Sequence, residues 1–169
     1  MVKSVFTAIT LLASSQAFCL DWERPDCSKY ADFGECRNAE SNNYRLQKQQ
    51  EFREKGLSFW YYERPDYSDN KKVEQALEDK VEGALFFSFT VKRDGSVADV
   101  ALKSKTSDEV AVFAEPILAA IKNWQFVPSE KDWQDQEWRY QFFFKQEDCD
   151  AEASDTEACA AEEKAASAE

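Results

Sequence analysis

A strand–turn–strand pattern between residues 84 and 103 constrains the fold more than any other feature of this chain. Large apolar side chains occupy every second position of its first half: Leu85, Phe87, Phe89 and Val91. This period of two residues predicts a β-strand with one strongly buried face. Asp94-Gly95 follows, and Gly95 can adopt a positive φ without steric cost. We therefore expect a hairpin turn, with residues 97–103 as the return strand.

A short helix is predicted just before this hairpin. Asn70 can serve as its N-cap, because the side chain of an N-cap residue accepts a backbone hydrogen bond from the first turn. Gly83 is placed to end the helix. Four apolar residues share one helical face: Val73, Ala76, Leu77 and Val81.

A second helix is predicted after the hairpin. We expect it to start near Ala114 or Glu115, because Pro116 is tolerated only in the first turn of a helix. The helix then runs into an extended segment in which Trp124 and Phe126 are buried and Pro128 ends the segment. Apolar residues recur at helical spacing along one face: Ile117, Leu118, Ile121 and Trp124.

A last strand is predicted over residues 138–144, after a polar loop that runs through Gln136. Aromatic side chains stand at every second position of this strand: Trp138, Tyr140, Phe142 and Phe144. The order of elements is helix, strand, strand, helix, strand. This order predicts an α+β fold, a small antiparallel three-stranded sheet with helices packed on one face.

Residues 20–69 are predicted to form a cysteine-containing extension with one helix. Residues 21–43 are rich in Asp, Asn, Gly and Cys, which favours a loop. Residues 43–55 are dense in good helix formers and end at Gly56. We expect this helix to be largely exposed, and an extended aromatic run, residues 57–62, to follow it. The predicted helix has only three large apolar side chains: Tyr44, Leu46 and Phe52.

Residues 1–19 have the composition of an export signal. A positive charge at Lys3 precedes an uncharged apolar stretch, and small residues stand at Ser15 and Ala17. The minor alternative is an uncleaved inner-membrane anchor, because the uncharged span of residues 4–20 is near the lower limit for a membrane helix.

The cysteine count agrees with export. Cleavage after Ala17 leaves five cysteines, whereas cleavage after Cys19 leaves four, an even number that suits an oxidising compartment. Local pairing is the simplest arrangement of these four, although all three connectivities remain open. A zinc site is not expected, because the chain has no C-x-x-C motif and no histidine. The four candidates for disulfides are Cys27, Cys36, Cys149 and Cys159.

Charge and motif content exclude several classes of function. The net charge is −12, and most of it lies in residues 146–169, where nine acids face the single Lys164. We expect this segment to be a disordered acidic tail. A net acidic chain without a basic stripe is not expected to bind nucleic acid. Without histidine, a nucleophile motif or a glycine-rich phosphate loop, we expect no enzymatic activity, no cofactor and no small-molecule substrate.

The elements from residue 71 to residue 145 resemble, in order and spacing, the TonB C-terminal domain family. The resemblance rests on Gly83, the alternating strand, the Asp94-Gly95 turn, the second helix, the Trp124-x-Phe126-x-Pro128 mark and the final strand. It divides the chain into a signal peptide (1–19), an extension (20–69), a TonB C-terminal-like domain (70–145) and the tail (146–169). Four residues of this family motif are expected in the core: Gly95, Trp124, Phe126 and Pro128.

The resemblance implies a periplasmic protein-interaction domain associated with TonB-type energy transduction or outer-membrane transport. In that family the last strand pairs with an extended peptide of a partner such as an outer-membrane receptor. The alternative is a structural or maintenance factor of the cell envelope that keeps the fold without receptor binding, with its last strand covered by the termini. Carried onto this chain, the predicted partner-binding residues are Glu137, Arg139, Gln141 and Phe143.

Overall fold

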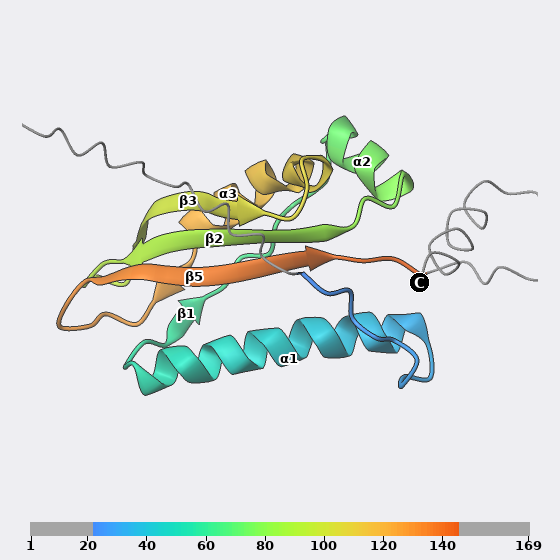
Figure 1. Ribbon diagram of the computed structural model, residues 1–169. Coiled ribbons are helices and arrows are strands. Elements are labelled where there is room, and N and C mark those ends of the chain that lie inside the picture. The colour runs from blue at the N-terminus through green and yellow to red at the C-terminus, as the bar shows by residue number, and fades with distance from the viewer. Residues whose placement is uncertain (1–21, 146–169) are drawn as a thin grey trace, which may run out of the picture.

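The computed structural model describes residues 22–145 of the 169-residue chain (Figure 1). The predicted export signal, the acidic tail, Cys149 and Cys159 lie outside the described residues.

A three-stranded antiparallel sheet forms the centre of the molecule (Figure 1). Its middle strand is β2 (Gly83–Val91), which lies between β3 (Val97–Lys105) and β5 (Trp133–Phe142). The predicted apolar face of β2 is buried, because Leu85, Phe87, Phe89 and Val91 are at most 1% exposed. The α+β class and the order of the elements are confirmed.

The last strand differs from its predicted bounds. β5 begins at Trp133, five residues earlier than expected, and ends at Phe142 rather than Phe144. The polar sequence before Trp138 predicts a loop, but Gln136 and Trp133 pair with Phe89 and Val91 of β2. Pairing with a buried central strand thus outweighs the local preference of these residues.

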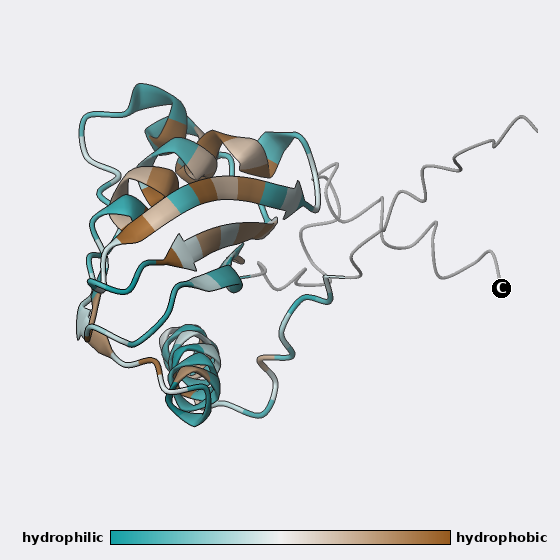
Figure 2. Cartoon of the chain, turned by 90° about the vertical axis from the view of Figure 1, so that its left-hand side faces the viewer, coloured by the Kyte–Doolittle hydropathy of each residue, from teal (hydrophilic) through white to brown (hydrophobic). Residues whose placement is uncertain are grey.

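Two short helices and a 3₁₀ turn pack together on one face of the sheet. They are α2 (Lys71–Glu78), η1 (Glu109–Phe113) and α3 (Ala114–Lys122). Figure 2 shows α2 and α3 together at the top, with α1 at the bottom. The start of α3 at Ala114 confirms the argument from Pro116.

The helix α2 begins as predicted but ends earlier. Asn70 is its N-cap and accepts the N–H of Val73 at 3.3 Å. The prediction that Gly83 ends the helix is wrong, because Gly83 is the first residue of β2. Lys80 adopts a positive φ of 54° and the N–H of Val81 donates to the carbonyl of Ala76, the pattern of a Schellman C-cap formed without glycine.

The N-terminal extension contains a helix much longer than predicted. α1 spans Phe33–Glu54, so the prediction of a loop up to residue 43 is wrong. Asp32 is the N-cap and accepts the N–H of Glu35 at 2.8 Å, while the Glu35 carboxylate accepts the N–H of Ala31. This reciprocal pair stabilises the first turn. The disulfide between Cys27 and Cys36 ties the preceding segment to the same turn and confirms the local pairing of these two cysteines.

A second, two-stranded sheet joins the extension to the domain. It consists of β1 (Phe59–Tyr61) and β4 (Gln125–Phe126), which pair antiparallel. Trp124 and Phe126 are buried at the end of α3, as the helix-to-strand pattern predicts. The Trp124 indole N–H donates to the carbonyl of Glu63 at 2.9 Å. Pro128, which we grouped with the core residues, is exposed.

The hairpin turn and the aromatic mark are in direct contact. Gly95 has a φ of 85°, and its carbonyl accepts the N–H of Phe126 at 2.8 Å. A Cβ atom at Gly95 would clash with the carbonyl oxygen of Phe126. Only glycine therefore allows the turn to approach β4 this closely.

Candidate partner-binding site

The outer edge of β5 is the feature that the sequence predicts as a partner-binding surface. In an antiparallel strand, alternate residues direct their N–H and C=O groups to the same side. The N–H of Arg139 points away from β2, because it donates to the hydroxyl of Tyr44 at 2.7 Å. Glu137 and Gln141, two positions away on either side, share this outward orientation. Three of the four predicted residues therefore direct their backbone groups outward, and the N–H of Arg139 is already bonded to Tyr44.

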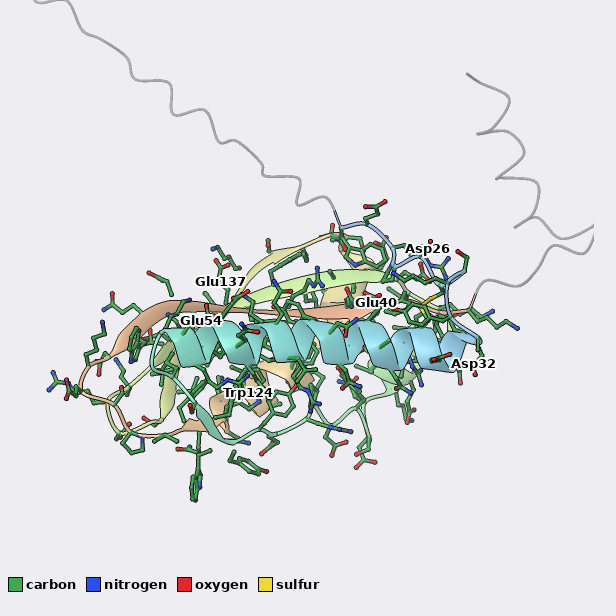
Figure 3. The ribbon with its side chains drawn as sticks, turned by 90° about the horizontal axis from the view of Figure 1, so that it is seen from below. Asp26, Asp32, Glu40, Glu54, Trp124 and Glu137 are labelled. Carbon is green, nitrogen blue, oxygen red and sulfur yellow. A yellow bond between two sulfur atoms is a disulfide. The ribbon has the colours of Figure 1, made fainter. Side chains whose placement is uncertain are left out.

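The helix α1 runs along this edge, antiparallel to β5 (Figure 1). The ring of Phe33, at the start of α1, lies 5.7 Å from that of Phe143. At the other end of the helix, the Nζ atom of Lys55 lies 3.5 Å from Oε1 of Gln136. Figure 3 shows α1 running alongside β5, with Glu137 and Trp124 on opposite sides of the helix in this view. The edge that the sequence predicts as partner-binding is covered here by the chain's own helix.

The four predicted partner-binding residues differ in their accessibility. Glu137 is exposed and forms an ion pair with Lys103 across the sheet. Arg139 and Gln141 are half-buried, and the guanidinium of Arg139 lies 4.6 Å from the centre of the Tyr44 ring. Phe143 follows the end of β5 and is buried against Phe33. The structure thus brings Glu137, Arg139 and Gln141 together along one side and places Phe143 in the core.

The C-terminal half of α1 is anchored in the core. Phe52 is 1% exposed, and its ring packs against four aromatic residues of the domain. Full burial of such a side chain stabilises the fold by about 1.5 to 3 kcal/mol. A partner cannot displace this end of α1 without opening the core. The ring centroids of these four residues lie 5.7 to 6.4 Å from that of Phe52: Phe59, Phe89, Phe126 and Trp138.

The segment before α1 is fixed to the far end of β5. Arg24 pairs with Glu82 at 3.2 Å and donates to the carbonyl of Phe144. The Glu82 carboxylate in turn accepts the N–H of Phe144 at 2.8 Å. These contacts join the N-terminal segment, the start of β2 and the end of β5.

A cleft lies between α1, residues 62–67 and β5, with a cavity of about 360 Å³. From β5, residues 138–141 line it, including Arg139 and Gln141. Its lining contains no Asp or Glu. The face that α1 turns toward it is polar and follows the helical spacing i, i+3, i+4, i+7. This face consists of Asn38, Ser41, Asn42 and Arg45.

Two tyrosine hydroxyl groups meet in this cleft. The phenol oxygens of Tyr62 and Tyr140 lie 3.0 Å apart. Burial raises the pKa of both phenols, so both are neutral at physiological pH. At Tyr62 the hydrogen bond from Tyr140 and the positive charges of Arg45 and Arg64 act in the opposite direction and lower the pKa. Both guanidinium groups therefore act on the same point of the cleft.

Sequence reasoning did not identify Arg45 and Arg64 as site residues. The polar stripe on α1 was readable in principle, because Asn38, Ser41, Asn42 and Arg45 follow one helical face. The prediction of a loop up to residue 43 hid this spacing. Arg64 carries no local signal, because only the packing of residues 62–67 against β5 brings it to the cleft.

Residues 22–145 hold no cluster of three or more His, Cys, Asp or Glu side chains suited to a metal ion. None of the helices in this part combines the length and apolar character needed to span a bilayer.

Comparison with known proteins identifies the domain. Residues 73–145 match the family model for the Gram-negative bacterial TonB protein C-terminal region. The solution structure of the Pseudomonas aeruginosa TonB C-terminal domain is 22% identical over 54% of this chain and 87% of that chain, with a TM-score of 0.38. The Helicobacter pylori TonB C-terminal domain (residues 179–285) is 21% identical over 63% of this chain and 85% of that chain, with a TM-score of 0.34. The search of curated proteins gave no match.

The family match covers β2, β3, α3 and β5, which are the elements that the sequence pattern orders most clearly. It leaves out α1 and β1, which cover the edge of β5 and complete the second sheet. Residues 73–145 thus form a domain of the TonB C-terminal type.

Proposed function

We propose that this protein is a non-enzymatic interaction domain of the cell envelope that binds an extended segment of a partner protein along β5. The TonB C-terminal family supports a role in TonB-type energy transduction and protein interaction. The position of Arg139 and Gln141 carries the proposal. Both residues direct their backbone groups away from β2, and both line the cleft beside α1. An outer-membrane receptor or transporter is the kind of partner that the family suggests.

The mode of binding differs from simple strand addition. Pairing with the outer edge of β5 requires Tyr44 to release the N–H of Arg139, and Phe52 holds the other half of α1 in place. The cleft needs no such rearrangement. We therefore place the partner segment in the cleft, where it contacts Arg139 and Gln141 while α1 remains docked.

A second candidate function is a structural or maintenance factor of the envelope that has kept the fold without receptor binding. The cover that α1 forms over β5 favours it, because the chain's own helix then takes the place of a partner strand. The contacts of Arg24 with Glu82 and Phe144 extend this cover to the end of the strand.

Photo-crosslinking distinguishes the two functions. A photoreactive residue is placed at Arg139 or Gln141 of the full chain in cells, with Lys122, exposed on α3, as the control position. We expect both cleft positions to capture the same envelope protein and the control to capture none. Silence at both positions, with capture at Lys122, would count against binding along β5, and silence at all three would favour the second candidate. Thermal unfolding of each variant checks that the fold is intact.

The N-terminal segment and the division of the chain into units also bear on the function. We propose that residues 1–19 direct export to the periplasm and that residues 20–69 and 70–145 act as one folded unit followed by the acidic tail. Determining the N-terminal residue of the mature protein tests the first point, because cleavage after Cys19 gives a start at Leu20, whereas an intact Met1 would indicate an anchor.

A further inference from the structure

We propose that the cleft between α1, residues 62–67 and β5 binds the carboxylate groups of an acidic, extended segment of a partner protein. This inference rests on the proposed function and adds the chemistry of the partner. It follows from the charge of the cleft, from its unpaired donors and from its shape.

The charge of the cleft is opposite to that of the rest of the chain. The full sequence contains 33 acidic residues and has a net charge of −12, yet no acidic residue lines this cavity. Arg45 stands on the α1 wall and Arg64 on the wall formed by residues 62–67. A pocket with cationic walls and no carboxylate attracts anionic groups.

The arginines of the cleft lack anionic partners. Among residues 22–145, neither Arg45, Arg64 nor Arg139 forms an ion pair, whereas Arg24 and Arg93 each pair with a carboxylate. The Nε atom of Arg45 is buried without a hydrogen-bond partner, and only its Nη2 atom donates, to Oδ1 of Asn42 at 3.1 Å. The Nε atoms of Arg139 and Arg24 are also buried without a hydrogen-bond partner, although Arg24 has a carboxylate beside it. A guanidinium carries five N–H donors, and leaving a buried one unpaired is unfavourable. Apart from the bond to Asn42, the guanidinium groups of Arg45 and Arg64 form no hydrogen bond or ion pair among residues 22–145, so their remaining Nη donors can serve an acceptor supplied by a ligand.

The other polar groups in the cleft suit a carboxylate. The hydroxyls of Tyr62 and Tyr140 are neutral donors 3.0 Å apart, and only one of the two can be satisfied by the other. A carboxylate accepts hydrogen bonds from a guanidinium in a bidentate arrangement and from phenols at the same time. The cavity, at about 360 Å³, has the size of sites that hold ligands larger than a single ion. Because β5 forms one wall, an extended peptide fits along it.

Binding of synthetic peptides to the full chain tests this inference. The probes are two fluorescent decapeptides, one alternating Glu and Ser and the other alternating Gln and Ser, followed by fluorescence anisotropy at low salt. We expect the acidic peptide to bind about tenfold tighter or more, and added salt to weaken it. Arg45→Gln and Arg64→Gln should each weaken binding about fivefold or more. Arg37→Gln, an exposed change on the same helix away from this cleft, should alter binding less than about twofold.

Several results would overturn the inference. Equal binding of the two peptides would exclude carboxylate recognition, yet crosslinking at Arg139 and Gln141 would still support the proposed function. An equal loss in Arg37→Gln would indicate nonspecific attraction. Stronger competition by inorganic phosphate than by acetate would assign the cleft to phosphate. Arg45→Lys, which keeps the charge, should bind more tightly than Arg45→Gln even where the neutral variant is destabilised, and equal binding would contradict a role for the charge.

The chain's own tail is the remaining occupant to exclude. Residues 146–169 carry nine acids and one lysine. In a full-length variant with these nine acids replaced by their amides, we expect the affinity for the acidic peptide to stay within about twofold. A gain of about tenfold or more would show that the tail occupies the cleft and would overturn the assignment to a partner protein.

Discussion

The hydroxyl of Tyr44 occupies the middle of the β5 edge, where it accepts a hydrogen bond from the backbone N–H of Arg139. Burial raises the pKa of this phenol, so the hydroxyl stays protonated. We expect Tyr44→Phe to lower the free energy of unfolding by about 1 kcal/mol, because a buried N–H loses its acceptor. The exchange of the Arg139 amide hydrogen should accelerate at the same time. Chemical denaturation and hydrogen exchange followed by NMR measure the two effects.

Tyr30→Phe is the matched control for this change. The hydroxyl of Tyr30 bonds to Glu40 at 2.9 Å near the start of α1 and makes no contact with β5. Exchange at Arg139 should be unaffected by it. If Tyr44→Phe also left that exchange unchanged, the edge would be protected by something other than the Tyr44 hydroxyl.

Gly95 supports a second prediction at the residue scale. Gly95→Ala forces a β-carbon into the carbonyl oxygen of Phe126 while φ is 85°. We expect a loss of about 2 to 4 kcal/mol in the free energy of unfolding. Gly56→Ala is the control, because Gly56 has a φ of 89° but a Cβ there would only touch Trp133 at 3.9 Å. It should cost about 1 to 2 kcal/mol, the conformational part alone. Equal losses in urea denaturation would mean that the contact with Phe126 relaxes freely.

At the scale of elements, α1 is part of the core although it lies outside the matched family region. Phe52→Ala should lower the free energy of unfolding by about 3 to 5 kcal/mol, because it leaves a cavity among the surrounding aromatic rings. Leu46→Ala on the same helix should change it by less than about 0.5 kcal/mol, since Leu46 is 53% exposed. Urea denaturation compares the two. If both substitutions changed the free energy of unfolding by a similarly small amount, α1 would not be packed against the domain in solution.

The elements predicted well from the sequence are those specified by local chemistry. The cap at Asn70, the alternation along β2 and the turn at Gly95 each depend on residues within one element. The junction of Trp124 and Phe126 belongs to the same class, because the helical spacing and the following proline lie within the twelve residues 117–128. Such signals need no knowledge of the tertiary structure.

The position of α1 depends on contacts that no local pattern contains. Its start at Phe33 was missed because Asp, Asn and Gly have low helix propensity, although Asp32 and Glu35 form a recognisable capping pair. The contact that covers β5 is made by one tyrosine hydroxyl across 95 positions of the sequence. The cleft, in turn, requires α1, residues 62–67 and β5 to meet, so neither Arg45 nor Arg64 could be assigned a role beforehand.

At the scale of the whole molecule, buried tyrosines predict how stability depends on alkaline pH. Burial raises the pKa of four phenols above their ordinary value of 10. A raised pKa in the folded state means that the stabilisation is fully present below pH 10 and is lost as the pH rises toward the folded-state pKa. We expect the urea midpoint to fall steadily above pH 10, with phenolate absorbance rising together with unfolding. The four residues are Tyr44, Tyr62, Tyr67 and Tyr140.

The cleft makes this alkaline transition sensitive to its occupant. Tyr62 and Tyr140 meet in the cleft, where Arg45 and Arg64 lower the pKa of Tyr62 against the effect of burial. A bound acidic peptide neutralises these charges and adds carboxylates, so it should raise the pKa of Tyr62 and delay the appearance of its phenolate. Alkaline titration of Tyr140→Phe, with and without the Glu-Ser decapeptide, isolates Tyr62 from its partner. A delay in this variant that disappears in Tyr140→Phe/Arg45→Gln would place the peptide beside Arg45, whereas an unchanged titration would place it outside the cleft.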